Sequence, residues 1–341
     1  MSDLARRVTS DVAFNGANVS TVLRDYLRSV SYTDVADGSS DSIKISLQNI
    51  DMKWLSEWYP EKGDQVTATL IYHDWKKTGD LQRLECGLFI LDDISFSGGP
   101  LVADFGATSV PLDNAFKSQE RTKTWENVTI QQIGSSITET YGLGFVYDAD
   151  TITIEAVEQS DKTDSAFLYE IAKDYGLAMK VYWNKIIMYD KGRYEAKDAV
   201  AQIGPRDFID GQFEYNDTLD GTYTGATFSY KNGTDSEEIE AAIGVTEGDG
   251  ARPLKISSKA DDLLEARIKA AAQVNRSNEK VTTLSFGIFP DPSIVATSCI
   301  EVVDMGRMSG KYFVDSVETE HSPEGTSQSL KLHRVVERVS A

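Results

Sequence analysis

The chain has 341 residues, of which 40% are hydrophobic and 10% aromatic, and it carries a formal net charge of −20. This length predicts two or three domains, and the apolar content is ample for packed cores. An acidic surface repels phosphate backbones, which argues against sequence-specific nucleic-acid binding. No window reaches the ~20 apolar residues of a transmembrane helix, and no apolar stretch follows Arg6 and Arg7, so we expect neither membrane insertion nor a Sec signal peptide. Folding in the cytoplasm is therefore expected.

Residues 1–105 are predicted to form a small β-barrel or sandwich domain. Apolar and polar residues alternate in several segments, which is typical of strands that have one buried face. These segments are Ser42–Leu47, Val66–Tyr72 and Leu88–Phe96. Turn-forming residues at 37–40, 60–63, 78–80 and 98–100 separate the strands, and this spacing favours a barrel.

Residues 106–204 are predicted to form an α+β insertion. A helix is expected over 129–140, where the isoleucines at 130, 133 and 137 have helical spacing. A second helix is expected over 164–175, with Asp164 as its N-cap and Gly176 as its stop. Short strands are expected at Gly144–Tyr147, Ala178–Tyr182 and Lys185–Tyr189, the last two joined by Trp183 and Asn184.

Residues 205–341 are predicted to form a second β domain with two interruptions. Residues 231–250 are polar and acidic, which indicates a long surface loop. Ser258 is the expected N-cap of a helix over 259–276, with an apolar stripe through Leu264, Ile268 and Ala271. Strands are expected at Val281–Phe289, Ser298–Val303, Tyr312–Glu320 and Ser329–Val335.

An internal repeat links the two β regions. Residues 87–94 (GLFILDDI) and 310–317 (GKYFVDSV) share the pattern glycine, any residue, aromatic, apolar, aliphatic, aspartate, any residue, aliphatic. Each copy follows one predicted strand and precedes a turn and another strand. Strands favour few residue types, so chance similarity is the alternative. The matching order of flanking elements favours a duplicated β domain, with residues 87–97 and 310–320 as equivalent hairpin strands.

The sequence offers no complete cofactor or metal site. Gly142 and Gly144 resemble part of a dinucleotide loop, but Tyr147 replaces the third glycine and a helix precedes the segment. Residues 216–221 resemble the start of a calcium loop, but the twelfth position is Thr227 rather than the required glutamate. Histidines and cysteines lack metal-ligand spacing; they are His73, His321, His333, Cys86 and Cys299. Both cysteines are expected to be buried small apolar residues, and no cofactor or metal is expected.

No catalytic residue is predicted either. Asp92 and Asp93 are adjacent, and neighbours on a regular strand point to opposite faces. Asp148 and Asp150 fall in a predicted turn. The pair at residues 73–74 (His-Asp) has no G-x-S-x-G serine to complete a triad. We therefore expect that the protein is not an enzyme.

Three aromatic residues lie close together in the first β region: Trp54, Trp58 and Tyr59. Such a cluster serves either as a carbohydrate-stacking face or as a packing or interface anchor. Large aromatic residues are more often buried, so packing is favoured.

Several motifs in order resemble the phage late control protein D family, the baseplate hub of contractile tails. They are Ser31–Asp34 (SYTD), Trp58–Gly63 (WYPEKG) leading into Val66–Ala68, Ala107–Leu112 (ATSVPL) and Arg121–Thr129 (RTKTWENVT). Residues 164–172 (DSAFLYEIA), with Gly176 and Leu177, are similar to a helix shared with type VI secretion spike proteins. The resemblance covers about residues 10–205 well, and the final third matches mainly in element order and in the repeated hairpin.

The resemblance implies two tube-type β-barrel domains that flank a small α+β domain. It also implies a homotrimer, whose similar domains form a pseudo-sixfold ring that docks on a sixfold tail tube. Such a subunit is structural and connects the tail tube protein to the central spike, with other baseplate proteins as partners. The expected location is the baseplate of a virion or phage-tail-like particle assembled in the bacterial cytoplasm. No family motif here is catalytic.

Two other functions stay open on the sequence. A tail-associated cell-wall-binding or peptidoglycan-degrading protein is expected to carry a Cys/His, glutamate or zinc constellation, which the sequence lacks. A type VI secretion spike-like subunit is expected to continue into a β-helical extension, whereas no β-helical repeat occurs before Ala341. The spike is therefore expected to be a separate polypeptide. Part of the negative charge is expected to face the ring channel and repel passing DNA, unless it only solvates the outer surface.

Overall fold

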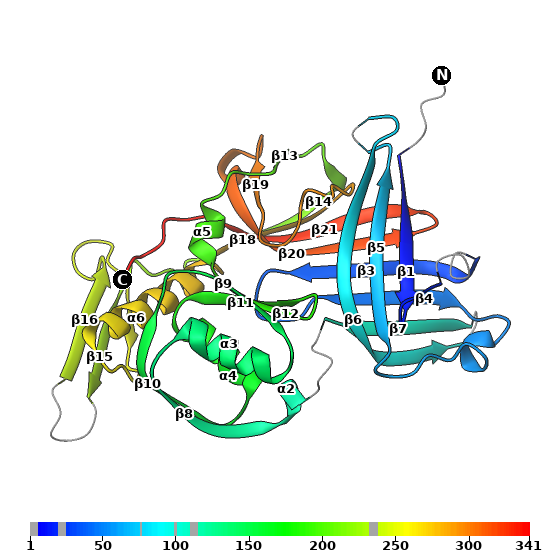
Figure 1. Ribbon diagram of the computed structural model, residues 1–341. Coiled ribbons are helices and arrows are strands. Elements are labelled where there is room, and N and C mark those ends of the chain that lie inside the picture. The colour runs from blue at the N-terminus through cyan, green and yellow to red at the C-terminus, as the bar shows by residue number, and fades with distance from the viewer. Residues whose placement is uncertain (1–5, 20–24, 76, 99–100, 110–114, 232–237) are drawn as a thin grey trace.

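The computed structural model describes residues 6–19, 25–75, 77–98, 101–109, 115–231 and 238–341. It is mainly β with an α+β insertion, which confirms the predicted fold class (Figure 1). Strands within residues 7–108 and 201–334 form one 13-stranded sheet, and strands within residues 120–190 and 225–256 form smaller sheets beside it.

The 13-stranded sheet consists of two lobes. The first lobe contains β1 (Arg7–Phe14), β2 (Ala17–Asn18), β3 (Leu27–Val35), β4 (Ser42–Gln48), β5 (Gln65–His73), β6 (Leu81–Ser97) and β7 (Val102–Thr108), with a 3₁₀ turn η1 (Lys53–Leu55). The second lobe contains β13 (Ala201–Ile203), β14 (Phe208–Asp217), β18 (Thr282–Ile288), β19 (Cys299–Val302), β20 (Gly310–Ser322) and β21 (Gly325–Arg334), with η2 (Gly306–Met308). Their order is β14-β18-β21-β20-β3-β4-β7-β6-β5-β1-β2; off this path, β19 pairs with β20, and β13 pairs with β19.

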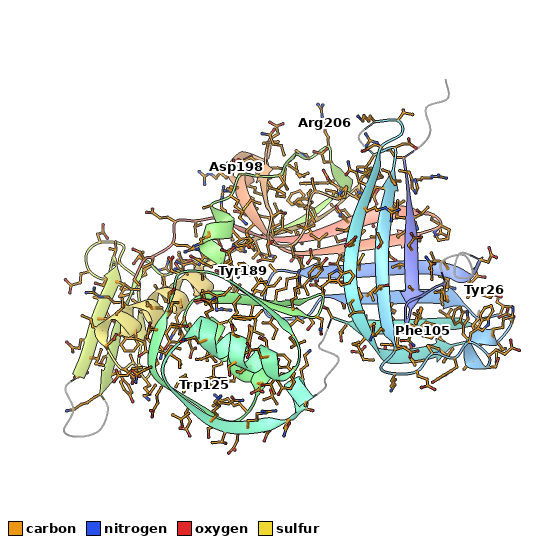
Figure 2. All side chains as sticks on the ribbon, viewed as in Figure 1. Tyr26, Phe105, Trp125, Tyr189, Asp198 and Arg206 are labelled. Carbon is orange, nitrogen blue, oxygen red and sulfur yellow. The ribbon has the colours of Figure 1, made fainter. Side chains whose placement is uncertain are left out.

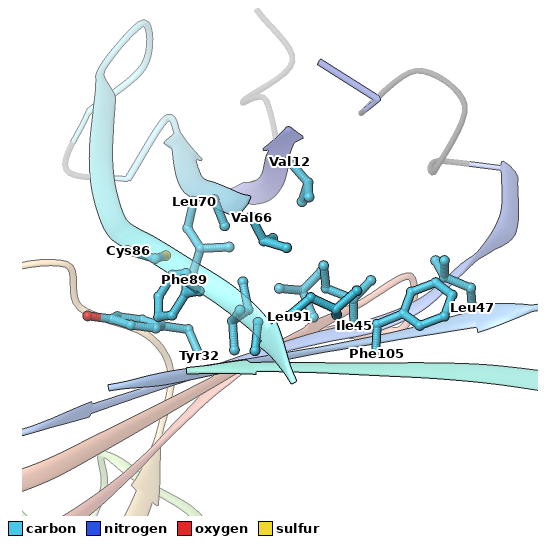
Figure 3. Packing of buried hydrophobic residues seen from close by; sticks show 14 of the residues in the cluster. Val12, Tyr32, Ile45, Leu47, Val66, Leu70, Cys86, Phe89, Leu91 and Phe105 are labelled. Carbon is cyan, nitrogen blue, oxygen red and sulfur yellow. The ribbon is translucent and has the colours of Figure 1, made fainter. Parts of the chain in front are cut away.

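Alternating side chains build the core of the first lobe. Along β4, Ile43, Ile45 and Leu47 are buried, while the residues between them are less buried, as the alternating sequence predicts. They pack with Phe89 and other residues of β5–β7 in one apolar cluster (Figure 3). The predicted strands of this region are confirmed. The predicted boundary at residue 105 falls inside β7, whose pairing with β4 and β6 continues to Thr108.

The insert, which we define as residues 115–200, has its own core. Its elements are α2 (Ala115–Ser118), β8 (Glu120–Thr129), α3 (Ile130–Thr140), β9 (Gly144–Asp148), β10 (Thr153–Thr163), α4 (Asp164–Asp174), β11 (Leu177–Tyr182), β12 (Lys185–Asp190) and α5 (Lys191–Glu195). Both predicted helices and the three predicted short strands are confirmed. The isoleucines at 130, 133 and 137 are all buried.

One cap in the insert was predicted wrongly. The N-cap of α4 is Thr163, whose side chain accepts a hydrogen bond from the Ala166 N–H. Asp164 instead is buried as the first residue of the helix. It accepts hydrogen bonds from the Tyr141 hydroxyl and the Gln159 side-chain amide, so its carboxylate ties the helix start to the neighbouring strand and helix.

A third unit packs a helix on a small sheet. It contains β15 (Gly225–Lys231), β16 (Glu238–Gly244), β17 (Pro253–Ile256) and α6 (Leu263–Asn278). The predicted acidic loop over 231–250 is wrong for residues 238–244, because β16 pairs with β15 as an antiparallel strand. It is confirmed for residues 245–250, which form turns without a helix or strand, and residues 232–237 lie outside the described residues. The acidic β16 resembles a loop in sequence because most of its side chains are exposed or only half-buried.

The helix α6 starts later than predicted. Its N-cap is Asp262, which accepts a hydrogen bond from the Glu265 N–H, and not Ser258. The predicted stripe is also wrong at Leu264, which is exposed. The helix instead buries small residues, including Ala266 and Ala270, because these allow close approach to the sheet.

Candidate functional site

The described residues contain no group of three or more histidine, cysteine, aspartate or glutamate side chains placed to hold a metal ion. No helix among them is long and apolar enough to cross a membrane. Cys86 and Cys299 are both free and buried, as predicted. Burial raises the pKa of both thiols, which is the opposite of what a nucleophilic cysteine needs.

The neighbouring carboxylates at 148 and 150 and the His-Asp pair at 73–74 all have structural partners. Asp148 and Asp150 both form ion pairs with Arg193, so they hold the end of β9 against α5. His73 shares a hydrogen bond of 2.9 Å between its Nε2 and the hydroxyl of Thr9. Asp74 accepts a hydrogen bond from the Gly79 N–H within a turn. These side chains therefore support local structure.

The two loop motifs are also structural. Gly142 follows α3 with a φ of +63°, which is a helix-ending conformation, and Gly144 begins β9. In the segment that resembles a calcium loop, Asp217 ends β14 and accepts a hydrogen bond from the Thr282 hydroxyl. Both segments thus serve as chain turns.

The aromatic cluster packs as predicted. Trp54 is buried in the first-lobe core, and its ring meets the Trp58 ring edge-on with centroids 5.3 Å apart. Tyr26 lies against both indoles, at the end of the lobe farthest from the insert (Figure 2). Tyr59 is half exposed and stacks on Phe96. The cluster closes this end of the lobe.

The residues that carry the internal repeat occupy equivalent places in the two lobes. β6 and β20 are the middle strands of β5-β6-β7 and β19-β20-β21. Ile90 lies opposite Gln65 and Thr108, and its repeat partner Phe313 lies opposite Cys299 and His333. The same offsets continue to Gly87 opposite Ala68, and Gly310 opposite Val302. The predicted equivalence of these strands is confirmed.

The irregular positions also coincide. Pairing with the next strand skips Asp92 in β6 and Asp315 in β20, so each repeat carries a bulge at its aspartate. Asp92 accepts a hydrogen bond from Thr108, and Asp315 shares one with His333. The expectation that Asp92 and Asp93 point to opposite faces assumed a regular strand, and the bulge makes both of them exposed.

A turn before each repeat is matched as well. Leu91 exchanges backbone hydrogen bonds with Gly63 and Asp64, and Val314 does the same with Thr297 and Ser298. Gly63 has a φ of +99° and Thr297 a φ of +78°, so both positions use the left-handed region. The correspondence therefore includes backbone conformation as well as pairing.

The correspondence extends to the edge of each lobe. Ser42 of β4 lies opposite Thr108 and Thr33, while Thr283 of β18 lies opposite His333 and Asn216. The strand β14 is therefore the counterpart of β3. In this alignment Tyr32 and Asp34 of β3 match Tyr215 and Asp217 of β14, and both strands carry an irregularity at their start.

The lobes meet at a seam where β3 pairs antiparallel with residues 316–321 of β20 (Figure 1). Asp34, which is buried at this seam, accepts a hydrogen bond from the Ala296 N–H and forms an ion pair with Lys180 of the insert. The Lys180 ammonium also lies 3.2 Å from Asp41. Burial raises the pKa of Asp41 to about 7, although the ammonium acts in the opposite direction. Lys180 thus connects the insert to the seam through two carboxylates.

A second charged network joins the remaining units. His333 of β21 lies between Asp315 and Glu195, and Arg338 binds both Glu195 and Glu279. Lys191 then connects Glu279 to Asp37 of the first lobe, at 2.8 Å and 3.6 Å. Hydrogen bonds from His333 and Arg338 lower the pKa of Glu195 to about 2 despite its burial. This network fixes the insert, both lobes and α6 relative to one another.

A cavity of about 1110 Å³ lies beside β1, facing the hairpin between β20 and β21. Arg7, His73 and Trp75 line it from the first lobe, and Phe289 and His321 from the second. Its lining combines cations, aromatic rings and two imidazoles, and each imidazole shares a hydrogen bond with a threonine hydroxyl, His73 with Thr9 and His321 with Thr326. Both hydrogen bonds join neighbouring segments of the same lobe, β1 to β5 and β20 to β21.

No protein-family model matches the chain. A curated protein of Escherichia phage 186 named "Probable baseplate hub protein" is 26% identical over 224 residues, which cover 63% of this chain and 54% of that protein. The match therefore spans about half the length of this relative. It confirms the resemblance to baseplate hub proteins that the sequence motifs indicated.

Solved structures share the fold. A tail protein from Neisseria meningitidis MC58 gives a TM-score of 0.71 at 12% identity, over 96% of this chain and 97% of that one. The 43 kDa tail protein of prophage MuSo2 from Shewanella oneidensis gives 0.69 at 12%, over 95% and 98%. A type VI secretion component from E. coli gives 0.56 at 11%, over 99% and 79%. The chain thus has the fold of phage tail proteins.

Proposed function

We propose that this chain is a structural baseplate hub subunit. In this proposal three copies form a pseudo-sixfold ring that connects the tail tube to a separate spike protein, in a phage or a phage-tail-like particle. The similarity to the phage 186 protein and the shared tail-protein fold support the placement in a tail. The subunit acts through its surfaces and not through a reaction.

The observation that carries the proposal is the correspondence between the two lobes. The same strand pairs, bulges and turns recur at matched positions in β3–β7 and in β14 with β18–β21. Two equivalent lobes in one chain let three chains present six similar units, which matches a sixfold tube with half as many subunits. The charged networks around Lys180 and His333 hold the lobes rigidly, as a docking ring requires.

A type VI secretion spike-like subunit is the second candidate, because a component of that system shares the fold over 99% of this chain. The two functions differ in whether the spike belongs to the same polypeptide. Isolation of particles with a distinct spike protein at the distal face of the ring supports the hub. A spike fused to this chain supports the second candidate.

Cryo-electron microscopy of the assembled particle tests the hub directly. We expect three copies of the chain directly below the tail tube, with the two lobes alternating around the ring. Six copies, or a single copy, at this position would contradict the proposal. In the same map, the charge of −20 can be located, and we expect part of it to line a channel that passes DNA.

A further inference from the structure

The strand β14 occupies the position in the second lobe that β3 occupies in the first, but among the described residues only β3 has a neighbouring strand on its outer edge. Val30 of β3 is fully buried, whereas its counterpart Phe213 is 44% exposed. Asp34 is buried, whereas its counterpart Asp217 is exposed. The difference has a simple cause, because β20 pairs with the outer edge of β3 while β14 is the last strand of the sheet.

A matching strand edge lies open in the first lobe. The stretch of β20 that holds β3 is residues 316–321, directly after the bulge at Asp315. The corresponding stretch of β6 is residues 93–98, directly after the bulge at Asp92. On that side β6 pairs with β5 only up to Ile90, and Leu91 bonds the turn at 63–64. Among the described residues no strand pairs with 93–97 on this side.

We propose that β14 of one copy pairs antiparallel with residues 93–98 of β6 in a second copy, in the register that β3 and β20 have within the chain. Thr33 lies opposite Glu318, and Ser31 opposite Glu320, at the internal seam. Transferred to the counterparts, Asn216 lies opposite the second copy's Ser95, and Glu214 opposite its Ser97. The proposal rests on the proposed ring and specifies its subunit contact.

Polar groups at the two edges are complementary in this register. Within the chain, the Ser31 hydroxyl donates to the Glu318 carboxylate at 3.0 Å. The counterparts of these residues are Glu214 and Ser95, so the donor and the acceptor have exchanged sides and the hydrogen bond is retained. If both of these positions held glutamate, the two carboxylates would repel each other across the strands.

The residues around the register match too. Asp34 accepts a hydrogen bond from the Ala296 N–H within the chain. The counterpart of Asp34 is Asp217, and the counterpart of Ala296 is Lys62 of the second copy, so this contact gains an attraction between opposite charges. The Ala36 N–H donates to the Asp315 carbonyl at 2.8 Å, and Ala36 is buried. Its counterpart is Leu219, an apolar side chain that is 73% exposed in the single chain. Pairing in this register buries it.

Such a contact joins two different surfaces of the same chain. Heterologous contacts of this kind close into a ring or propagate as a filament, depending on the rotation between copies. An unpaired, exposed edge strand is otherwise an aggregation hazard, which natural proteins cover or blunt. The assembly thus gives β14 the neighbour that β3 already has.

Disulfide trapping tests the register. The double variant Ser95→Cys/Asn216→Cys places a thiol on each edge, and residues directly opposite each other on paired strands lie within disulfide range. Oxidation of the concentrated full-length protein is expected to give species of two and three linked chains of 37.6 kDa on a non-reducing gel. The pair Ser97→Cys/Glu214→Cys is expected to link equally well.

Control variants distinguish pairing in the proposed register from mere closeness of the two strands. The pair Ser95→Cys/Glu214→Cys is offset by two residues, which puts the sulfurs beyond easy reach. It is expected to link at least 10-fold more slowly, and each single variant is expected to stay unlinked beyond background. Equal linking of the offset pair, or no linking of the matched pairs up to the solubility limit, overturns the proposed register.

The same gel distinguishes this inference from the proposed ring. If native mass measurement finds a trimer and the matched pairs stay unlinked, the ring stands and the strand contact is wrong. If the matched pairs link but the ladder continues beyond three chains, the strand contact stands and the closed trimer is wrong.

Discussion

The two lobes keep the same backbone plan and differ in the side chains that hold their outer strands. Asp92 and Asp315 occupy the same bulge, but one binds the neutral Thr108 and the other the buried His333. Asp34 is enclosed with Lys180, whereas its counterpart Asp217 is exposed. The comparison shows that the lobes share the geometry of strand pairing. The partners of matched side chains differ, because different parts of the molecule pack over each position.

Removing the lysine at the seam is expected to have the largest effect. In Lys180→Met, the buried Asp34 and Asp41 lose their shared cation, and breaking a buried ion pair from one side costs about 3–5 kcal/mol. Urea unfolding near pH 8 measures the loss. The control is Lys162→Met, because the pair between Lys162 and Glu170 is exposed and worth at most about 1 kcal/mol. Equal losses in both variants would show that the seam does not depend on Lys180.

The repeat could be predicted because backbone constraints fix its residue types. Gly87 and Gly310 have φ values of +123° and +142°, which few other residues adopt, and both bulges carry an aspartate. The counterpart strands β3 and β14 share only Tyr-x-Asp and were not matched from the sequence. Their equivalence depends on pairing across distant segments, which sequence periodicity does not record.

Other errors have local causes. The ribbon of β8 and β10 was not predicted, because most of its side chains are exposed and show no apolar alternation. For α6, Ser258 was the only N-cap that we predicted, but β17 continues to Ile256 and the helix begins after Asp262. The sequence predicted no catalytic or metal site whose position the structure could test. The open strand edges could not be predicted, because they depend on the order of the strands in the sheet.

The second lobe is expected to lose stability as the pH rises. Burial disfavours the charged form of His333, but its hydrogen bonds with Asp315 and Glu195 raise its pKa to about 9, with Glu279 and Arg338 nearby. Because the folded pKa exceeds the unfolded value of about 6.5, this stabilisation is full below pH ~6.5 and is lost as the pH rises towards ~9. It amounts to at most about 3 kcal/mol.

The free energy of unfolding of wild type and His333→Gln, measured at pH 6 and pH 9.5, tests this point. The difference between the proteins is expected to shrink at the higher pH. The first-lobe variant Thr108→Val serves as the control, because threonine does not titrate, and its effect is expected to be independent of pH. Parallel pH profiles for all three proteins would contradict a charged His333.

The repeat glycines are expected to respond alike. Gly87→Ala and Gly310→Ala each force a Cβ onto a backbone with positive φ, which costs about 1–3 kcal/mol. Gly287→Ala is the control, because this glycine lacks a positive φ and an added Cβ meets its nearest neighbour at 3.8 Å. Thermal unfolding of the three variants measures the effect. A loss confined to one lobe would weaken the equivalence of the strands.

The smallest effect is expected where the lobes differ in the turn before the repeat. Thr297 has a φ of +78°, which strains a β-branched residue, whereas the first lobe has Gly63 at the matching position. Thr297→Gly relieves this strain but gives the unfolded chain more freedom, so we expect a net stabilisation of about 1 kcal/mol. The reciprocal Gly63→Thr introduces the strain at a φ of +99°, where it outweighs the reduced freedom of the unfolded chain, and is expected to destabilise by about 1 kcal/mol or more. Denaturant midpoints measure both changes, and a loss of stability in Thr297→Gly would show that the threonine side chain has a role that the glycine turn lacks.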